Sequence, residues 1–188
     1  FLNAADAAYD HDSDGAIVIR EGMIEAVGPA EQVIAGLEGD YELADYRGTD
    51  KLILPGFVDC HVHYPQLQVI GAYGTQLIDW LNKYTFVAEQ AFADEDYATE
   101  VAGIFFRELT RAGTTTAATF CTVHPQSVDA FFSEAAKLNL RMIAGKVCMD
   151  RNAPDALCDT AQSAYDDSKA LIERWHGENL ASCQECTH

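Results

Sequence analysis

The order of apolar and polar positions changes part-way along the chain. Its first part contains two runs rich in β-branched residues, 16–19 and 23–27, separated by Arg-Glu-Gly. Gly22 suits the left-handed position of a tight turn, so these runs predict a β-hairpin. A further β-type run covers residues 51–63 and is interrupted by Pro55-Gly56.

From residue 94 onward, helical periodicity alternates with β-type runs. Apolar residues recur every three or four positions in 94–113, 125–139 and 160–177, which predicts three helices. The runs between them, 114–123 and 141–149, are rich in β-branched and apolar residues and predict strands. Strands that alternate with helices of this length predict βαβ units on a parallel sheet.

The chain offers about three such units after residue 50, whereas a closed (β/α)8 barrel needs about 250 residues. From the residues alone, the fold class is therefore α/β, either as a small open sheet or as the front part of a barrel.

Composition narrows the class of protein. The 188 residues are 48% apolar, which is typical of a globular protein, and no apolar run is long enough to span a membrane. The net charge of −18 argues against nucleic acid or an anionic membrane as a partner. Six irregularly spaced cysteines and a start without signal-peptide features favour a cytoplasmic protein with reduced thiols. The first residue is not Met, which leaves open where the natural chain begins.

Two histidines provide the clearest chemical signal. His61 and His63 follow the β-type run, and Asp59 precedes them. Side chains at i and i+2 of a strand share a face, so all three are predicted to line one face at the carboxyl end of a parallel strand. Neutral imidazole suits Zn²⁺ or Fe²⁺. Two ordinary histidines near a loop are the alternative, and the strand and hairpin before them favour the metal site.

Several segments resemble a known family. PGFVDCHVHYPQ (55–66) resembles the first metal motif of the amidohydrolase superfamily, and DGAIVIREGMIEAVGP is similar to the β-sandwich segment before it in that superfamily's deaminases. DWLNKYTF (79–86) and GKVCMDRNAP (145–154) resemble more specifically the bacterial guanine deaminases. The resemblance covers about residues 14–177.

The resemblance implies the N-terminal part of a metal-dependent hydrolase TIM (β/α)8 barrel. Residues 1–50 would form part of a small β-sandwich, and 51–177 would form the first strand–helix units of an incomplete barrel. The tail, 178–188, does not resemble the next barrel strand. Its Cys183-x-x-Cys186 with His188 is either half a zinc ribbon or, as we prefer, part of an artificial or frameshifted end.

The activity that the resemblance implies is zinc-dependent hydrolysis of guanine to xanthine and ammonia. His61 and His63 match ligands of one Zn²⁺ per subunit, with Fe²⁺ as the alternative, and Gln66 matches the substrate-binding glutamine. Asp59 either orients a ligand histidine or caps the loop. The catalytic general base is expected outside this chain, so the chain alone is predicted to be an inactive fragment. The partners would be a purine and, in a homodimer, a second copy.

Other substrates and functions stay open. The alternatives are another amidohydrolase, acting on an aromatic ring amine or chloride of the cytosine or triazine type, or a fragment without catalysis.

The remaining candidates carry weaker signals. Trp80 and Tyr84 either wall a purine pocket or belong to the core, and Trp80 is retained as a substrate-binding candidate. His124 either faces the pocket or caps the following helix. Lys146 is interpreted as structural. Arg151 and Asn152 are candidates for a polar lining that nothing else in the sequence supports.

Overall fold

The computed structural model describes residues 11–74, 76–178 and 181–183. The chain divides into two compact units, and the boundary between them in the sequence lies between Leu54 and Pro55. The boundary expected after residue 50 falls in the same segment, 36–56, which has no helix or strand.

The first unit contains the predicted hairpin. Strands β1 (Gly15–Arg20) and β2 (Met23–Pro29) pair antiparallel, and helix α1 (Ala30–Ala35) follows. Glu21 and Gly22 have φ values of 52° and 78°, and a two-residue turn with both φ values positive matches the twist of paired strands. The described part of this unit holds this one two-stranded sheet, so the β-sandwich stays a prediction.

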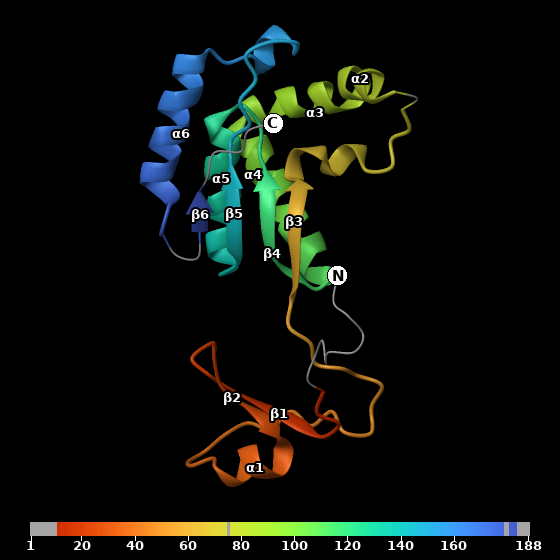
Figure 1. Ribbon diagram of the computed structural model, residues 1–188, viewed down its shortest axis with the longest axis vertical. Coiled ribbons are helices and arrows are strands. Elements are labelled where there is room, and N and C mark those ends of the chain that lie inside the picture. The colour runs from red at the N-terminus through yellow and green to blue at the C-terminus, as the bar shows by residue number, and fades with distance from the viewer. Residues whose placement is uncertain (1–10, 75, 179–180, 184–188) are drawn as a thin grey trace, which may run out of the picture. The chain divides into compact units, whose positions relative to one another are not determined.

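The second unit is built on a parallel sheet, as predicted. Figure 1 shows its strands side by side, with helices α4 and α5 behind them. The strands pair in chain order: β3 (Phe57–His63), β4 (Thr114–Phe120), β5 (Arg141–Gly145) and β6 (Ala181–Cys183).

The three predicted helices are confirmed as α4 (Glu95–Arg111), α5 (Pro125–Lys137) and α6 (Ala161–Trp175). Helix α4 begins after Asp94, whose carboxylate accepts hydrogen bonds from the N–H groups of two first-turn residues and so satisfies donors that the helix leaves open. None of the described helices combines the length and the apolar composition needed to cross a membrane.

Strand β3 is shorter than the run that predicted it. Residues 51–56 precede the strand, which starts at Phe57. Pro55 has no N–H to donate to a neighbouring strand. A Cβ on Gly56 would lie 2.0 Å from the hydroxyl of Thr115, so only glycine fits where the chain enters the sheet.

The segment between β3 and α4 was not assigned from the sequence. It folds into a succession of short helical pieces, and a π-helix lies in the middle. The pieces are η1 (Tyr64–Val69), α2 (Leu77–Trp80), the π-helix η2 (Leu81–Thr85), α3 (Phe86–Gln90) and η3 (Ala91–Ala93). A further short 3-10 helix, η4 (Asp155–Leu157), lies in the loop after β5.

The tail after residue 177 was expected not to resemble the next barrel strand, yet part of it joins the parallel sheet. Residues Ala181–Cys183 form β6, parallel to β5. Strand pairing uses main-chain N–H and C=O groups, so the edge of β5 can pair with a short segment that carries no strand pattern of its own.

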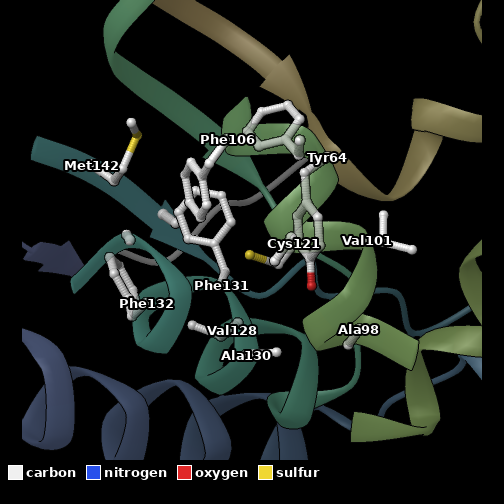
Figure 2. Close-up of a cluster of buried hydrophobic side chains, with 14 of the residues drawn as sticks. Tyr64, Ala98, Val101, Phe106, Cys121, Val128, Ala130, Phe131, Phe132 and Met142 are labelled. Atoms are coloured by element: carbon white, nitrogen blue, oxygen red, sulfur yellow. The ribbon is translucent and has the colours of Figure 1, made fainter. Parts of the chain in front are cut away.

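The core of the second unit lies between the sheet and helices α4 and α5. Figure 2 shows its aromatic side chains converging, with Tyr64 among them. The rings of Phe106 and Phe131 are 4.8 Å apart, and Phe131 lies 5.2 Å from Tyr64. Burying each large apolar side chain contributes on the order of 1.5–3 kcal/mol, so this cluster holds the helices against the sheet.

Candidate metal and substrate site

The two histidines meet at the carboxyl end of β3. The Nε2 atoms of His61 and His63 lie 3.3 Å apart. The ring of Phe120, at the end of β4, stacks on His63 with centroids 4.6 Å apart and planes inclined by 13°. His61 is exposed and His63 is half-buried, and both lie at the carboxyl end of β3, where such folds place their chemistry.

The spacing of the two imidazoles fits a shared metal ion. Nitrogen ligands of a tetrahedral zinc lie about 2.0–2.1 Å from the ion, which separates two of them by roughly 3.4 Å. The same spacing also fits a hydrogen bond between two neutral rings, with roles set by the tautomers. The described part of the chain holds no group of three His, Cys, Asp or Glu side chains that would bind a metal.

The prediction of which β3 side chains share a face is only partly correct. Val58 pairs with Thr116 and His63 pairs with Phe120, with a register shift between these pairs. Thr116 and Phe120 are four residues apart on β4 and therefore share a face. Val58 thus lies on the same face as His63, although simple alternation had placed them on opposite faces. The irregularity inside β3 breaks the alternation.

Asp59 does not share the face of the histidines. Its register partner is Ala117, on the side of β4 opposite to Phe120. The Asp59 carboxylate accepts a hydrogen bond of 3.0 Å from the main-chain N–H of His61. This contact matches the capping alternative, in which Asp59 shapes the backbone beside the first histidine.

Tyr64 anchors the end of β3. Its side chain is fully buried, and its hydroxyl donates a hydrogen bond of 2.6 Å to the main-chain carbonyl of Ser127. Burial raises the pKa of Tyr64 well above its ordinary value, so the hydroxyl stays a donor. The residue next to His63 is therefore tied to the first turn of α5.

Gln66 lies one turn beyond the histidine motif and contacts a buried acid. Its amide Nε2 donates to Glu89 Oε1 at 3.4 Å. Glu89 is 5% exposed, and burial raises its pKa to about 7 although the Gln66 amide acts in the opposite direction. Sequence reasoning missed Glu89. The available signal was a lone acid inside the apolar run FVAEQAF.

Trp80 supports the loop before its own helix. Its indole N–H donates a hydrogen bond of 2.9 Å to the main-chain carbonyl of Ala72. The backbone of Gly74 also lies close, since a Cβ added there would be 2.6 Å from the Trp80 Cβ. Trp80 and Tyr84 are both half-buried. These contacts give Trp80 a structural role, and its substrate-binding role stays a prediction.

His124 and Lys146 follow the next two strands. His124 occupies the N-cap position of α5 but makes no capping hydrogen bond through its side chain. Burial lowers the pKa of His124, and its Nε2 has no hydrogen-bond partner among the described residues. Lys146 is buried and its ammonium lies 2.8 Å from Asp159 and 3.5 Å from Asp167. The ion pairs support the structural interpretation of Lys146.

Four further residues named from the sequence do not join these contacts or lie outside the described part of the chain. Arg151 and Asn152 are exposed, and Arg151 lies 3.6 Å from the neighbouring Asp150. Cys186 and His188, the other two members of the proposed zinc ribbon half, lie outside the described residues.

An imidazole pair, an amide and a buried acid thus gather beside the carboxyl end of a parallel sheet. The sequence pattern of the amidohydrolase family matches residues 52–182. The chain belongs to the amidohydrolase family.

Two guanine deaminases are similar to this chain over most of its length. Guanine deaminase of Escherichia coli is 55% identical over 163 residues, which are 87% of this chain and 37% of that protein. Its solved structure has a TM-score of 0.84 at 53% identity and covers 90% of this chain and 39% of that one. A crystal structure of guanine deaminase from Bradyrhizobium japonicum has a TM-score of 0.85 at 40% identity, with coverages of 90% and 36%.

A more distant amidohydrolase fold carries a metal. An adenosine deaminase from Xanthomonas campestris, solved with bound zinc, has a TM-score of 0.73 at 22% identity and covers 93% of this chain and 38% of that one. This likeness shows the fold alone. The chain spans less than two fifths of each of these proteins.

Proposed function

We propose that the protein to which this chain belongs hydrolyses guanine to xanthine and ammonia, with one zinc ion per subunit held in part by His61 and His63. The observation that carries the proposal is the pair of imidazoles 3.3 Å apart in a chain 55% identical to a guanine deaminase. Neutral imidazole nitrogens at this spacing suit zinc, with Fe²⁺ as the alternative. When bound, the ion supplies Lewis-acid chemistry for hydrolysis.

The chain's own residues have distinct parts in this proposal. His61 and His63 hold the ion on one side, and Phe120 limits the movement of both rings by contact. Gln66 provides an amide, which offers a donor and an acceptor to the edge of a purine. The general base of the reaction is expected outside this chain.

Two further properties belong to the same proposal. The resemblance to guanine deaminases implies a homodimer. The six irregularly spaced cysteines support a reducing compartment such as the cytoplasm. Sedimentation of the full-length protein measures the first property, and microscopy of a tagged protein measures the second.

The test uses the full-length product of the gene that encodes this chain. Purified with zinc, it should release ammonia from guanine, lose activity with a chelator, and recover it on addition of zinc. Adenine, cytosine and a chlorinated triazine serve as comparison substrates. Efficient use of one of these, with no turnover of guanine, would show that the substrate is wrong while the fold is right.

A further inference from the structure

Glu89 is an acid in a place that disfavours its charge. It is 5% exposed, and burial raises its pKa to about 7. A buried carboxylate costs stability when it ionises, so its presence calls for a role that an apolar residue cannot fill. Its carboxyl group accepts a hydrogen bond from the Gln66 amide, and this bond joins η1 to α3.

The chemistry of the two side chains defines their orientation. In the structure the Glu89 carboxyl oxygen accepts from Gln66 Nε2, and the Gln66 amide has an NH₂ donor on one side and a carbonyl acceptor on the other. Contact with Glu89 therefore selects the NH₂ side of Gln66. The carbonyl oxygen and the second N–H then stay available for a ligand. The present donor–acceptor distance of 3.4 Å is long, and such contacts often tighten when a ligand binds.

The π-helix determines which residue of α3 faces Gln66. Helix pieces α2, η2 and α3 follow one another without a break, and η2 has the wider π-helical turn. A π-turn adds a residue relative to an α-helix, so it rotates every later position by about 100°. Glu89 is buried beside Gln66, whereas the next residue, Gln90, is exposed.

We propose that Glu89 is a positioning residue that holds the amino side of Gln66, so that the amide carbonyl oxygen and one N–H face the substrate. The ligand that this arrangement selects is a heteroaromatic ring whose edge places a donor beside an acceptor. This inference rests on the proposed function, in which Gln66 contacts the purine.

The test is a double-mutant cycle on the zinc-loaded, full-length protein, with kcat and KM for guanine measured for each variant. Gln66→Ala should lower kcat/KM roughly ten- to a hundredfold, as expected for loss of one buried polar contact. Glu89→Gln replaces one carboxyl oxygen with an NH₂ group that donates instead of accepting, and it should lower kcat/KM about three- to tenfold, chiefly through KM. In the Gln66→Ala background, Glu89→Gln should have no further effect, because the residue on which it acts is gone.

Zinc content and Tm are measured alongside the kinetics. Glu100→Gln, at an exposed position of α4, is the matched control and should leave kcat and KM unchanged. Equal losses from Glu89→Gln with and without Gln66 would overturn the inference, and so would an unchanged KM in Glu89→Gln.

Failure of the proposed function would be seen separately, as a wild-type protein that binds zinc but does not hydrolyse guanine. In that event the side-chain amide NMR signals of Gln66, assigned by their loss in Gln66→Ala, decide the positioning claim. Glu89→Gln should shift them, whereas the Glu100→Gln control should not. Signals unchanged by Glu89→Gln would overturn the claim.

Discussion

The hydroxyl group of Tyr64 donates a hydrogen bond of 2.6 Å to the main-chain carbonyl oxygen of Ser127. The bond joins the residue after His63 to the first turn of α5. The Tyr64 ring also meets Phe92 edge-on, with centroids 5.2 Å apart. The end of β3 is therefore held from the core side, while the two imidazoles lie at the end of the sheet.

Tyr64→Phe should destabilise the full-length protein without removing its metal. The change keeps the ring but leaves the Ser127 carbonyl without this donor, which costs about 1–3 kcal/mol. Thermal unfolding should show a lower Tm, with zinc content unchanged. Tyr165→Phe, at an exposed position of α6, is the control and should leave Tm unchanged. An equal Tm for Tyr64→Phe and wild type would show that the hydrogen bond does not stabilise the fold.

His61→Ala and His63→Ala should each abolish guanine turnover and lower the zinc content of the full-length protein. Each change removes one of the two nitrogens that lie 3.3 Å apart, and a catalytic zinc typically depends on three or so protein ligands. Zinc is measured by mass spectrometry on purified protein. His11→Ala, at an exposed position of the first unit, should retain zinc and activity. Unchanged zinc in both site variants would mean that these histidines are not ligands.

Glu89→Gln should stabilise the full-length protein at alkaline pH and not at acidic pH. Burial raises the folded-state pKa of Glu89 from 4.5 to about 7, so the folded protein holds this proton more tightly than the unfolded chain. Stability from this group is present below pH 4.5 and is lost as pH rises through 7. Above pH 7 the cost is about 3 kcal/mol, which Glu89→Gln removes.

The measurement for Glu89 is Tm at pH 5 and at pH 8 for wild type and Glu89→Gln. The difference between the two proteins should grow from pH 5 to pH 8. A difference that stays constant across this range would show that Glu89 keeps an ordinary pKa in the folded protein.

Residues 1–188 purified by themselves should bind zinc weakly and hydrolyse no guanine. Within the described ranges no third metal-ligand side chain joins His61 and His63. Phe57 and Val58 on β3 are 57% and 64% exposed, and exposed apolar strand residues favour association. One tightly held zinc, a cooperative thermal transition and ammonia release from guanine would together contradict this prediction.

Local sequence patterns were enough to predict most of the second unit. The periodicity of 94–113 and 125–139 predicted α4 and α5, since one apolar face per helix is a property of residues three and four apart. The β-branched run after Gly113 predicted β4 for the same local reason. His61 and His63 were also predicted to share a strand end, because two residues of one strand keep their neighbours in any tertiary context.

The short helical pieces at 64–93 were not predictable in this way. A π-helix has no simple apolar period, and its place in η2 depends on the packing of α2 and α3 around it. Strand β6 likewise depends on the pairing edge of β5 and not on a pattern of its own.

What the sequence by itself determined was the α/β order of the elements, the hairpin before them and the proximity of the two histidines, because each follows from residues within a few positions of one another. Only the tertiary structure decided that Asp59 leaves the histidine face, that Tyr64 ties β3 to α5, and that Glu89 meets Gln66. These depend on a register shift within β3 and on contacts between residues as many as 63 positions apart, where no periodicity in the chain carries the information.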